Sequence, residues 1–333
     1  MSEANPVVLS GRVRLARNYF DLPFPNRESA ENAETCIERA KSALPEERYR
    51  VVRLKDLDSE SRMALVEEHL VSRDLLQNST SGAALIRDDQ RVSVMVNEED
   101  HLRIQAIVTG FDLPAAAKEA FEVEKQLQAA CAFSFDHQLG YLTACPTNTG
   151  TGMRASLMMH LPMLTRLKQM GNVGQSVAKL GLTIRGIYGE GSEALGDLYQ
   201  VSNQVTLGRT EQELMEAVVA VGKQMIGMES ALRKTTLAQK PCDFQDVVYR
   251  SYGVLRYARQ MEEKEFMLHW SNLRMGAACE LLPISLAEVD RLLTLAQSAH
   301  AAKRLSESEP ELTVNRARCD VVREALNPKP QEG

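Results

Sequence analysis

The segment VSVMV-NEEDH, residues 92–101, places three consecutive carboxylates directly behind an apolar run. Residues 92–96 alternate with a period of two and are rich in β-branched side chains, so they are predicted to form a strand. The preceding residues 88–91 have turn chemistry and 83–87 are mostly apolar, which predicts an antiparallel hairpin. Three carboxylates at a strand end repel one another unless cations face them. The loop is therefore expected either to face water as an ordinary charged loop or to meet cationic groups.

Arginines on other extended segments are candidates for these cations. Arg12 and Arg14 lie two residues apart, so they share one face of a strand, a pattern that an exposed edge strand would also explain. A guanidinium group matches phosphoryl oxygens with paired, planar hydrogen bonds, which makes phosphate binding the functional alternative. The candidates are Arg12 and Arg14 in the extended stretch 7–18, Arg103 in the strand predicted at 102–108, and Arg185 in the strand predicted at 181–187.

Two loops rich in small residues add further polar groups. The loop CPTNTGTGMR at 145–154 is predicted to open a helix at 154–164, which would place Arg154 in the first turn, where the helix dipole favours anions. It lacks the lysine and the spacing of a P-loop, so any nucleotide must be held differently. The loop YGEGSEALG at 188–196 carries Glu190, and its three glycines predict a mobile lid.

The composition is that of an ordinary globular protein of 333 residues, 44% hydrophobic and 25% charged. No apolar run reaches the roughly 18 residues that span a bilayer, and the start has no signal-peptide layout, so no membrane association and a cytoplasmic location are expected. The six cysteines contain no C-x-x-C pair, which predicts free thiols and no zinc site. A net charge of -6 and a pI near 5.7 argue against direct nucleic-acid binding.

The order of the predicted elements indicates an α+β fold with an antiparallel sheet, because hairpins occur and a βαβ rhythm does not. Thr210 and Glu213 have capping-box spacing and predict the start of a long helix. Strands cease after about residue 207, and helices separated by short breaks follow from Phe244. We therefore predict two domains, 1–239 and 240–333. The other predicted helices are 26–43 with Asn26 as N-cap, 59–70 and 114–133, and the other predicted strands are 50–54 and 198–207.

Taken in order, these motifs resemble the phosphagen (guanidino) kinases and, within that family, the bacterial protein arginine kinases. The resemblance covers most of the chain and implies an antiparallel sheet flanked by helices, with ATP and Mg²⁺ as cofactors. The matching segments are SGRVRLARN at 10–18, NEEDHLR at 97–103, CPTN at 145–148 with Arg154, and RGIYGEG at 185–191.

The resemblance also implies a role for each matched residue. Glu99 becomes the main catalytic carboxylate, Glu190 the second one, and Cys145 a thiolate beside the guanidinium, although a small packed cysteine would look the same in sequence. Such an arrangement suits phosphoryl transfer, which depends on positioning and charge neutralisation. Magnesium would be held by phosphates and water, so no protein metal site is expected. The implied ATP-binding residues are Arg12, Arg14, Arg103, Arg154 and Arg185.

Departures from the family pattern narrow the choice of substrate. Kinases of free guanidines carry a helical domain before the first arginine motif, whereas only residues 1–6 precede Val7 here, which predicts an open site for side chains of proteins. The resemblance implies that the helical region 240–333 mediates dimerisation and substrate docking. Its RDxxRA-like stretch has Cys319 for the first arginine but keeps Asp320 and Arg323 as candidate phosphoarginine ligands. Weak or absent phosphoarginine binding is expected.

The resulting prediction is an ATP-dependent protein arginine kinase of the stress response. The resemblance implies a homodimer that marks proteins with exposed arginines for Clp-type degradation, with a zinc-finger activator and a Clp chaperone-protease as partners. Two alternatives remain open: a kinase for a free guanidino metabolite, and a catalytically silent phosphoarginine- or protein-binding module.

Overall fold

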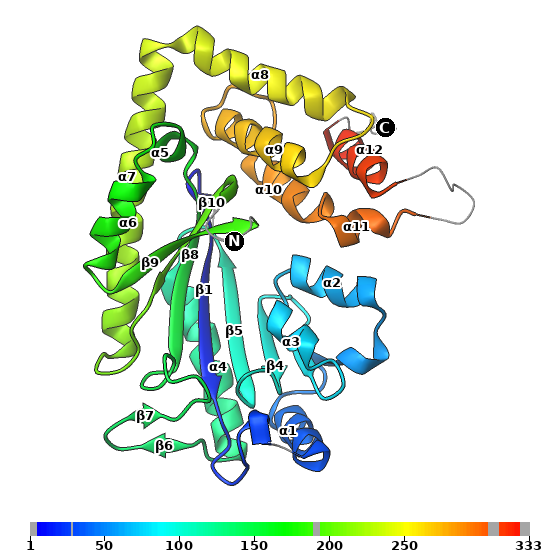
Figure 1. Ribbon diagram of the computed structural model, residues 1–333, viewed down its shortest axis with the longest axis vertical. Coiled ribbons are helices and arrows are strands. Elements are labelled where there is room, and N and C mark those ends of the chain that lie inside the picture. Colours follow the sequence, from blue (N-terminus) through cyan, green and yellow to red (C-terminus); the bar gives the residue numbers. More distant parts are fainter. Residues whose placement is uncertain (1–4, 28, 189–193, 306–312, 327–333) are drawn as a thin grey trace.

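A computed structural model describes residues 5–27, 29–188, 194–305 and 313–326. Its centre is an eight-stranded sheet in which all neighbouring strands are antiparallel, in the order β2-β3-β4-β5-β1-β8-β10-β9 (Figure 1). A small hairpin of β6 (Phe135–Asp136) and β7 (Gly140–Tyr141) stands apart from this sheet. The strands of the main sheet are β1 (Val8–Arg17), β2 (Tyr49–Arg53), β3 (Ala83–Arg87), β4 (Val92–Val96), β5 (Leu102–Thr109), β8 (Met153–His160), β9 (Leu182–Tyr188) and β10 (Ala194–Asn203).

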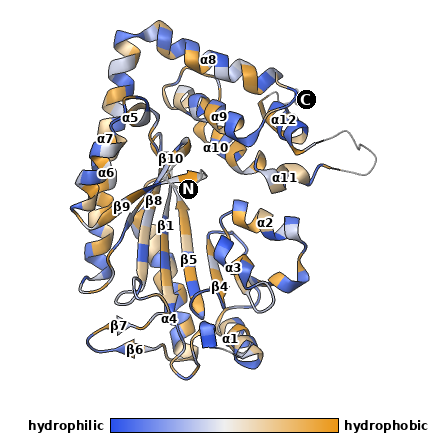
Figure 2. Ribbon diagram, viewed as in Figure 1, coloured by the Kyte–Doolittle hydropathy of each residue, from blue (hydrophilic) through white to orange (hydrophobic). Residues whose placement is uncertain are grey.

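The two faces of the sheet differ because side chains alternate along each strand. On β1, Val13 and Leu15 point into the main core, so Arg12 and Arg14 belong to the opposite face. The apolar face is covered mainly by α1 (Ala30–Ala43), α4 (Leu113–Ala130) and α7 (Glu211–Gln239), and α6 (Met170–Ala178) adds Val173 and Val177 to the same core. Along α7, hydrophilic and hydrophobic residues are interspersed, as expected of an amphipathic helix (Figure 2).

A second, smaller core covers part of the opposite face at β3 and β4. Ile86 and Met95 point away from the main core and pack against Leu65 and Leu75 of the short helices α2 (Ser59–Glu67) and α3 (Arg73–Gln77). Two 3-10 turns, Pro25–Arg27 and Leu54–Asp56, complete this half of the chain. The helices α2 and α3 therefore flank the part of the sheet that carries the arginines.

The C-terminal region is helical, as predicted, but it does not pack only against itself. Its buried Trp270 belongs to a core that also contains Leu9, Met163 and Leu198 from the first half of the chain. Among the described residues, no helix is long and apolar enough to cross a membrane. The remaining helices are α5 (Pro162–Arg166), α8 (Pro241–Tyr257), α9 (Glu263–Ala278), α10 (Leu286–Leu295), α11 (Ser298–Ala302) and α12 (Val314–Leu326).

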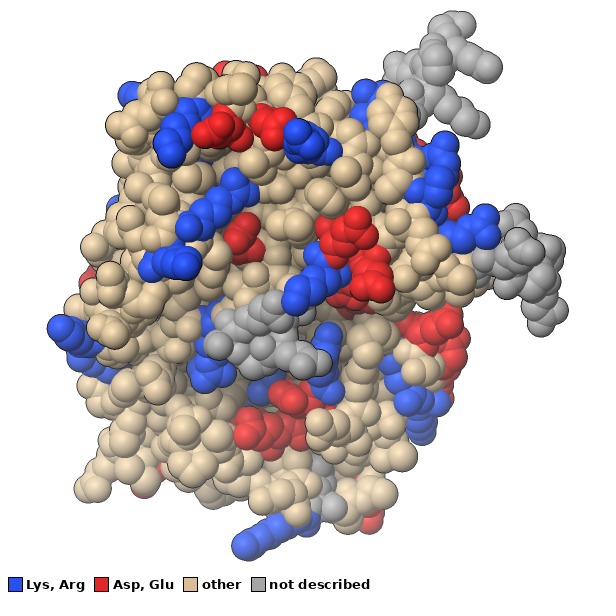
Figure 3. Space-filling view, turned by 45° about the horizontal axis from the view of Figure 1, so that its top comes forward, with Lys and Arg blue, Asp and Glu red and all other residues tan. Residues whose placement is uncertain are grey.

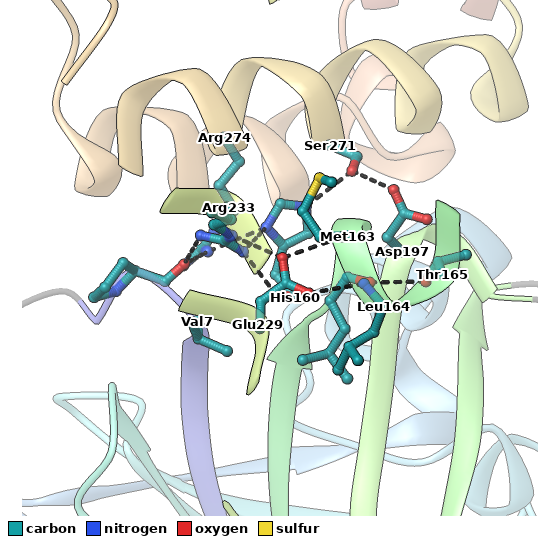
Figure 4. A network of polar contacts seen from close by, with 12 residues as sticks. Val7, His160, Met163, Leu164, Thr165, Asp197, Glu229, Arg233, Ser271 and Arg274 are labelled. Atoms are coloured by element: carbon teal, nitrogen blue, oxygen red, sulfur yellow. Dashed lines mark hydrogen bonds and ion pairs between the residues drawn. The ribbon is translucent and has the colours of Figure 1, made fainter. Parts of the chain in front are cut away.

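A buried polar network joins the sheet to α7 and α9 (Figure 4). The guanidinium of Arg233 lies 2.7 Å from Glu229 and donates to the carbonyl oxygens of Pro6 and His160. Arg274 of α9 donates to the same Pro6 oxygen at 2.8 Å. Burial, together with Arg274 and Arg233, lowers the pKa of His160, so its ring is neutral and can accept hydrogen bonds from both arginines. The segment that leads into β1 is thus tied to both halves of the chain.

Two local predictions are wrong. The predicted helix at 154–164 is strand β8, because Met153, Ala155, Leu157 and Met159 alternate into the main core while β1 and β10 pair on either side. The first α-helix begins at Ala30, with Ser29 and not Asn26 as its N-cap. The predicted α+β fold and the capping box at Thr210 are confirmed.

Candidate active site

The carboxylate loop at 97–101 is held by hydrogen bonds to segments that are distant in sequence. Asn97 adopts a left-handed conformation with φ of 60°, and its Nδ2 donates to the carbonyl oxygens of Ala33 and Ser81 at 2.9 and 3.0 Å. The ring of His101 accepts from the Tyr19 backbone N–H through Nδ1 at 3.0 Å and contacts the Pro23 carbonyl through Nε2. Both ends of the loop are therefore fixed.

The middle of the loop separates three carboxylates into three environments. Asp100 is buried, and its Oδ1 accepts from the Ala144 backbone N–H at 2.7 Å and from Asn18 Nδ2 at 2.6 Å. Glu98 is buried against Arg103, whereas the side chain of Glu99 is 42% exposed and lies 3.7 Å from Arg103 Nη2. Glu99 is thus the one carboxylate of this loop that is free to meet a substrate.

Arginines from adjacent strands form a row on the open face of the sheet. Arg14 of β1 pairs in register with Arg154 of β8, and Arg103 of β5 lies opposite Ala16 of β1. The Nη2 of Arg12 donates to Gln200 on β10 at 2.6 Å. Gln200 in turn lies opposite Arg185 of β9, whose side chain is exposed. Strands β1, β5, β8 and β9 thus bring the five arginines predicted from the sequence to one face of the sheet.

The electrostatics of this row indicate an anion site. Burial lowers the pKa of the Arg14 guanidinium, and the positive charges of Arg12, Arg103 and Arg154 lower it further. Burial also lowers the pKa of Arg154, with Arg185 and Arg103 acting in the same direction. Among the described residues, Nε of Arg14 is a buried donor without a hydrogen-bond partner. Figure 3 shows Lys and Arg side chains around a hollow, with Asp and Glu side chains beside it. A bound polyphosphate would satisfy these donors and relieve their repulsion.

The loop with Cys145 borders the arginine row. The thiol is half-buried and lies 3.0 Å from the Thr147 hydroxyl, near Arg154. Thr206 fixes the loop by donating to the carbonyl oxygens of Thr147 and Thr149. Arg154 reaches the site from a strand, so the predicted contribution of a helix dipole does not apply.

The remaining predicted site residues lie elsewhere. Glu190 falls outside the described residues. Asp320 and Arg323 on α12 form an ion pair, and Arg323 also donates to the carbonyl oxygen of Ala258 at 2.7 Å. Arg318, which could have replaced the arginine missing at Cys319, is buried and bound to the carbonyls of Ala296 and Met261. It is therefore a structural residue, and a phosphoarginine pocket at Asp320 and Arg323 stays a prediction.

Sequence reasoning assigned no role to three residues that shape this site. Glu98 and Asp100 stand beside Glu99 in the sequence and look equivalent to it, and only their burial sets them apart. Gln200 contacts Arg12 across the sheet, and the register that brings them together joins segments 188 residues apart. The alternation along residues 198–203, which places Gln200 on the face opposite Val201, was the one available signal.

Comparison with known proteins identifies related phosphotransferases. The family described as "ATP:guanido phosphotransferase, C-terminal catalytic domain" matches residues 31–232, and the "Protein-arginine kinase McsB C-terminal domain" matches residues 241–333. A protein-arginine kinase of Caldanaerobacter subterraneus subsp. tengcongensis is 44% identical over 89% of this chain and 90% of its own length. One of Staphylococcus saprophyticus is 40% identical over 98% and 95%, and one of Bacillus subtilis is 42% identical over 81% and 76%.

Solved structures show the same fold. A lombricine kinase matches with a TM-score of 0.60 at 24% identity, over 70% of this chain and 69% of that one. A duplicated taurocyamine kinase from Schistosoma mansoni, with bound transition state analog components, matches with a TM-score of 0.62 at 26% identity. That match covers 71% of this chain and 35% of the longer one.

Proposed function

The chain belongs to the protein-arginine kinases of the ATP:guanido phosphotransferase family, and we propose that it transfers a phosphoryl group from ATP to arginine side chains of proteins. The observation that carries this proposal is the exposed Glu99 beside the arginine row. Relatives with the same name match nearly the whole chain, including the helical region after residue 240. The groups proposed to bind ATP and the substrate arginine, the arginine row and Glu99, lie on one face of the sheet.

We propose that the arginine row binds the phosphates of ATP. Arg12, Arg14, Arg103, Arg154 and Arg185 provide planar donor sets on neighbouring strands, and such groups stabilise the charge of a transferring phosphoryl group. Bound Mg²⁺ would offset phosphate charge and would be held mainly by phosphate oxygens and water. The strands place the backbones of these arginines on one face before the nucleotide binds, which supports the proposal because less reorganisation is then needed.

Glu99 is proposed to act on the guanidinium of the substrate. A guanidinium is protonated at neutral pH, so its terminal nitrogen becomes a nucleophile only when a carboxylate orients it and accepts a proton. Glu99 is exposed enough to receive a side chain and lies next to Arg103 of the phosphate site. Glu190 is proposed as a second carboxylate on the strength of the sequence alone. The attacking nitrogen forms a bond to the γ-phosphorus as the bond from that phosphorus to the bridging oxygen of ADP breaks. ADP leaves, and Glu99 accepts the proton that the nitrogen gives up.

One incubation distinguishes this function from its two alternatives. The chain is mixed with ATP, Mg²⁺, a loosely folded protein and free arginine, and the acid-labile phosphate is then located. Phosphate on the protein is expected. Phosphate on free arginine alone would indicate a metabolite kinase, and no transfer with intact ATP binding would indicate a silent binding module.

Replacing Arg154 by lysine is expected to weaken ATP binding by about tenfold or more, because a hydrogen bond to a charged group contributes roughly 1.5–3 kcal/mol and lysine lacks the planar fork. Isothermal calorimetry measures the affinity. Arg48→Lys, at an exposed position ahead of β2, is the matched control and should bind like the parent. Unchanged affinity in Arg154→Lys would contradict the assignment.

Cys145 is proposed to act as a thiolate beside the substrate guanidinium. Modification by a small thiol reagent in the absence of ATP is therefore expected to abolish most of the transfer rate. Because Cys242 is more exposed than Cys145, the experiment uses a Cys242→Ser background. The same reagent on Cys145→Ala in that background should change nothing. A full rate after complete labelling of Cys145, verified by mass spectrometry, would identify it as a packing residue.

Further proposals rest on the family alone. We propose a cytoplasmic homodimer that marks proteins for Clp-type degradation in the stress response, with a zinc-finger activator and a Clp chaperone-protease as partners. Light scattering of the full chain measures the oligomeric state. Binding of phosphoarginine at Asp320 and Arg323 is proposed to be weak, because a ligand must first break their ion pair. Titration of the chain and of Arg323→Ala with phosphoarginine tests the pocket, and tight binding that survives the substitution would place it elsewhere.

A further inference from the structure

We propose that Glu98 is a positioning residue, which fixes the guanidinium of Arg103 for phosphoryl transfer while its neighbour Glu99 meets the substrate. The proposal rests on the proposed function in one respect: Arg103 is taken to contact the phosphates of ATP. Two carboxylates that are adjacent in sequence thereby have different roles.

Both carboxylate oxygens of Glu98 lie close to the guanidinium of Arg103, and we call this pair of contacts the clamp. Glu98 Oε2 lies 2.7 Å from Arg103 Nε, and Glu98 Oε1 accepts from Arg103 Nη1 at 2.7 Å. The hydroxyl of Ser72 donates a second hydrogen bond to Oε1. The Glu98 side chain is 1% exposed and that of Arg103 is 15% exposed. One hydrogen bond and one close ion-pair contact, both at a buried carboxylate, therefore hold the guanidinium of Arg103 in place.

The clamp does not involve Nη2 of Arg103. A guanidinium has five N–H donors in a fixed plane, and Glu98 accepts a hydrogen bond from Nη1 while it lies in ion-pair contact with Nε. Nη2 remains on the side of Glu99, at 3.7 Å from its carboxylate. Arg103 therefore presents Nη2 toward the place where the phosphoryl group and the substrate nitrogen must meet.

Glu98 itself is held rigidly. It lies on the turn between β4 and β5, where the left-handed Asn97 sets the path of the chain. The carboxamide of Asn78 donates to the carbonyl oxygens of Asn97 and Glu98 at 3.3 and 3.0 Å. Burial raises the pKa of Glu98, while Arg103 and the hydroxyl of Ser72 act in the opposite direction. Because Ser72 also caps α3, the small helical unit on the open face supports the clamp.

The clamp also adjusts the charge of the site. Glu98 lies near Arg14 as well as Arg103, so its carboxylate offsets part of the positive charge of the arginine row. Its removal should therefore not weaken the attraction of the site for ATP. It should instead let Arg103 move, and a misplacement of a catalytic group by about 1 Å costs on the order of 100-fold in rate. A lower turnover without weaker ATP binding is the signature of this role.

The first test compares Glu98→Gln with the parent protein. We expect kcat to fall by about 10- to 100-fold, with calorimetric ATP stoichiometry near one and an affinity equal to or tighter than that of the parent. The matched control is Glu119→Gln, which neutralises one of the two carboxylates that pair with Arg87 at the opposite end of the hairpin and should leave kcat unchanged. A kcat within about threefold of the parent would overturn the proposal, as would an ATP affinity that falls as much as kcat.

The second test is a double-mutant cycle with Arg103→Ala. If Glu98 acts through Arg103, then Glu98→Gln should cost little further activity in the Arg103→Ala background. Equal losses of kcat in both backgrounds would show that Glu98 acts on something else and refute the proposal. If the parent transfers no phosphate at all, the proposed function fails. In that case the calorimetric comparison alone decides on Glu98: ATP affinity that is weaker in Glu98→Gln than in the parent counts against the clamp, and equal or tighter affinity supports it.

Discussion

Replacing Glu99 by glutamine is expected to lower the rate of phosphoryl transfer by about 100- to 10,000-fold, the range typical of a lost general base. The amide keeps the shape of the side chain but can neither accept a proton nor neutralise the substrate guanidinium. Because Glu99 is exposed and lies 3.7 Å from Nη2 of Arg103, the change leaves the buried hydrogen bonds of the loop intact. Folding and ATP affinity should therefore stay close to those of the parent protein.

The measurement is single-turnover transfer of labelled phosphate to a protein substrate, with ATP affinity determined in parallel. Glu47→Gln, an exposed carboxylate ahead of β2, serves as the matched control and should be fully active. Rates of Glu99→Gln within tenfold of the parent would remove Glu99 from the catalytic set. Glu99→Gln should lower the transfer rate more than Glu98→Gln does. The first change removes the proton acceptor, whereas the second only loosens the position of Arg103.

The sequence predicted the architecture of the site because its main signals are local. The alternation at residues 92–96, the turn before it and the charged loop after it all lie within a single hairpin, and β4 and β5 follow the prediction closely. Arg12 and Arg14 share a face in any extended segment, so their common orientation followed from spacing alone. The helices after residue 240 were recognisable for the same reason.

Features that depend on contacts between distant segments could not be predicted from the sequence. Residues 154–159 contain alanine, leucine and methionine, which are strong helix formers, so local propensity favoured a helix. The segment is nevertheless strand β8, because it fills the place between β1 and β10, and Arg14 pairs with Arg154 over a separation of 140 residues. The burial of Glu98 and Asp100 could not be predicted from local sequence either. It depends on contacts with Ser72, Asn18 and Ala144, which lie in other segments of the chain.

Replacing Arg274 by methionine should destabilise the whole protein, because the guanidinium joins the C-terminal helices to the segment that leads into β1. It is fully buried, lies 2.6 Å from Asp290 of α10 and donates to the carbonyl oxygens of Pro6 and Asn5 at 2.8 and 3.0 Å. Methionine fills much of the volume but leaves a carboxylate and two carbonyls without this partner. Breaking a buried ion pair in this way costs about 3–5 kcal/mol.

Urea unfolding measures this loss as a lower transition midpoint at an unchanged slope. The matched control is Arg250→Met on α8, where Arg250 lies 2.7 Å from Asp246 but is exposed, so the change should leave the transition midpoint nearly unchanged. A loss in Arg274→Met no larger than in the control would contradict the role of the network. Because Leu9 and Trp270 share one core across the same junction, we expect both halves of the chain to unfold in a single transition. Two separate transitions in the parent protein would show that the helical region unfolds independently and that Arg274 does not couple the two halves of the chain.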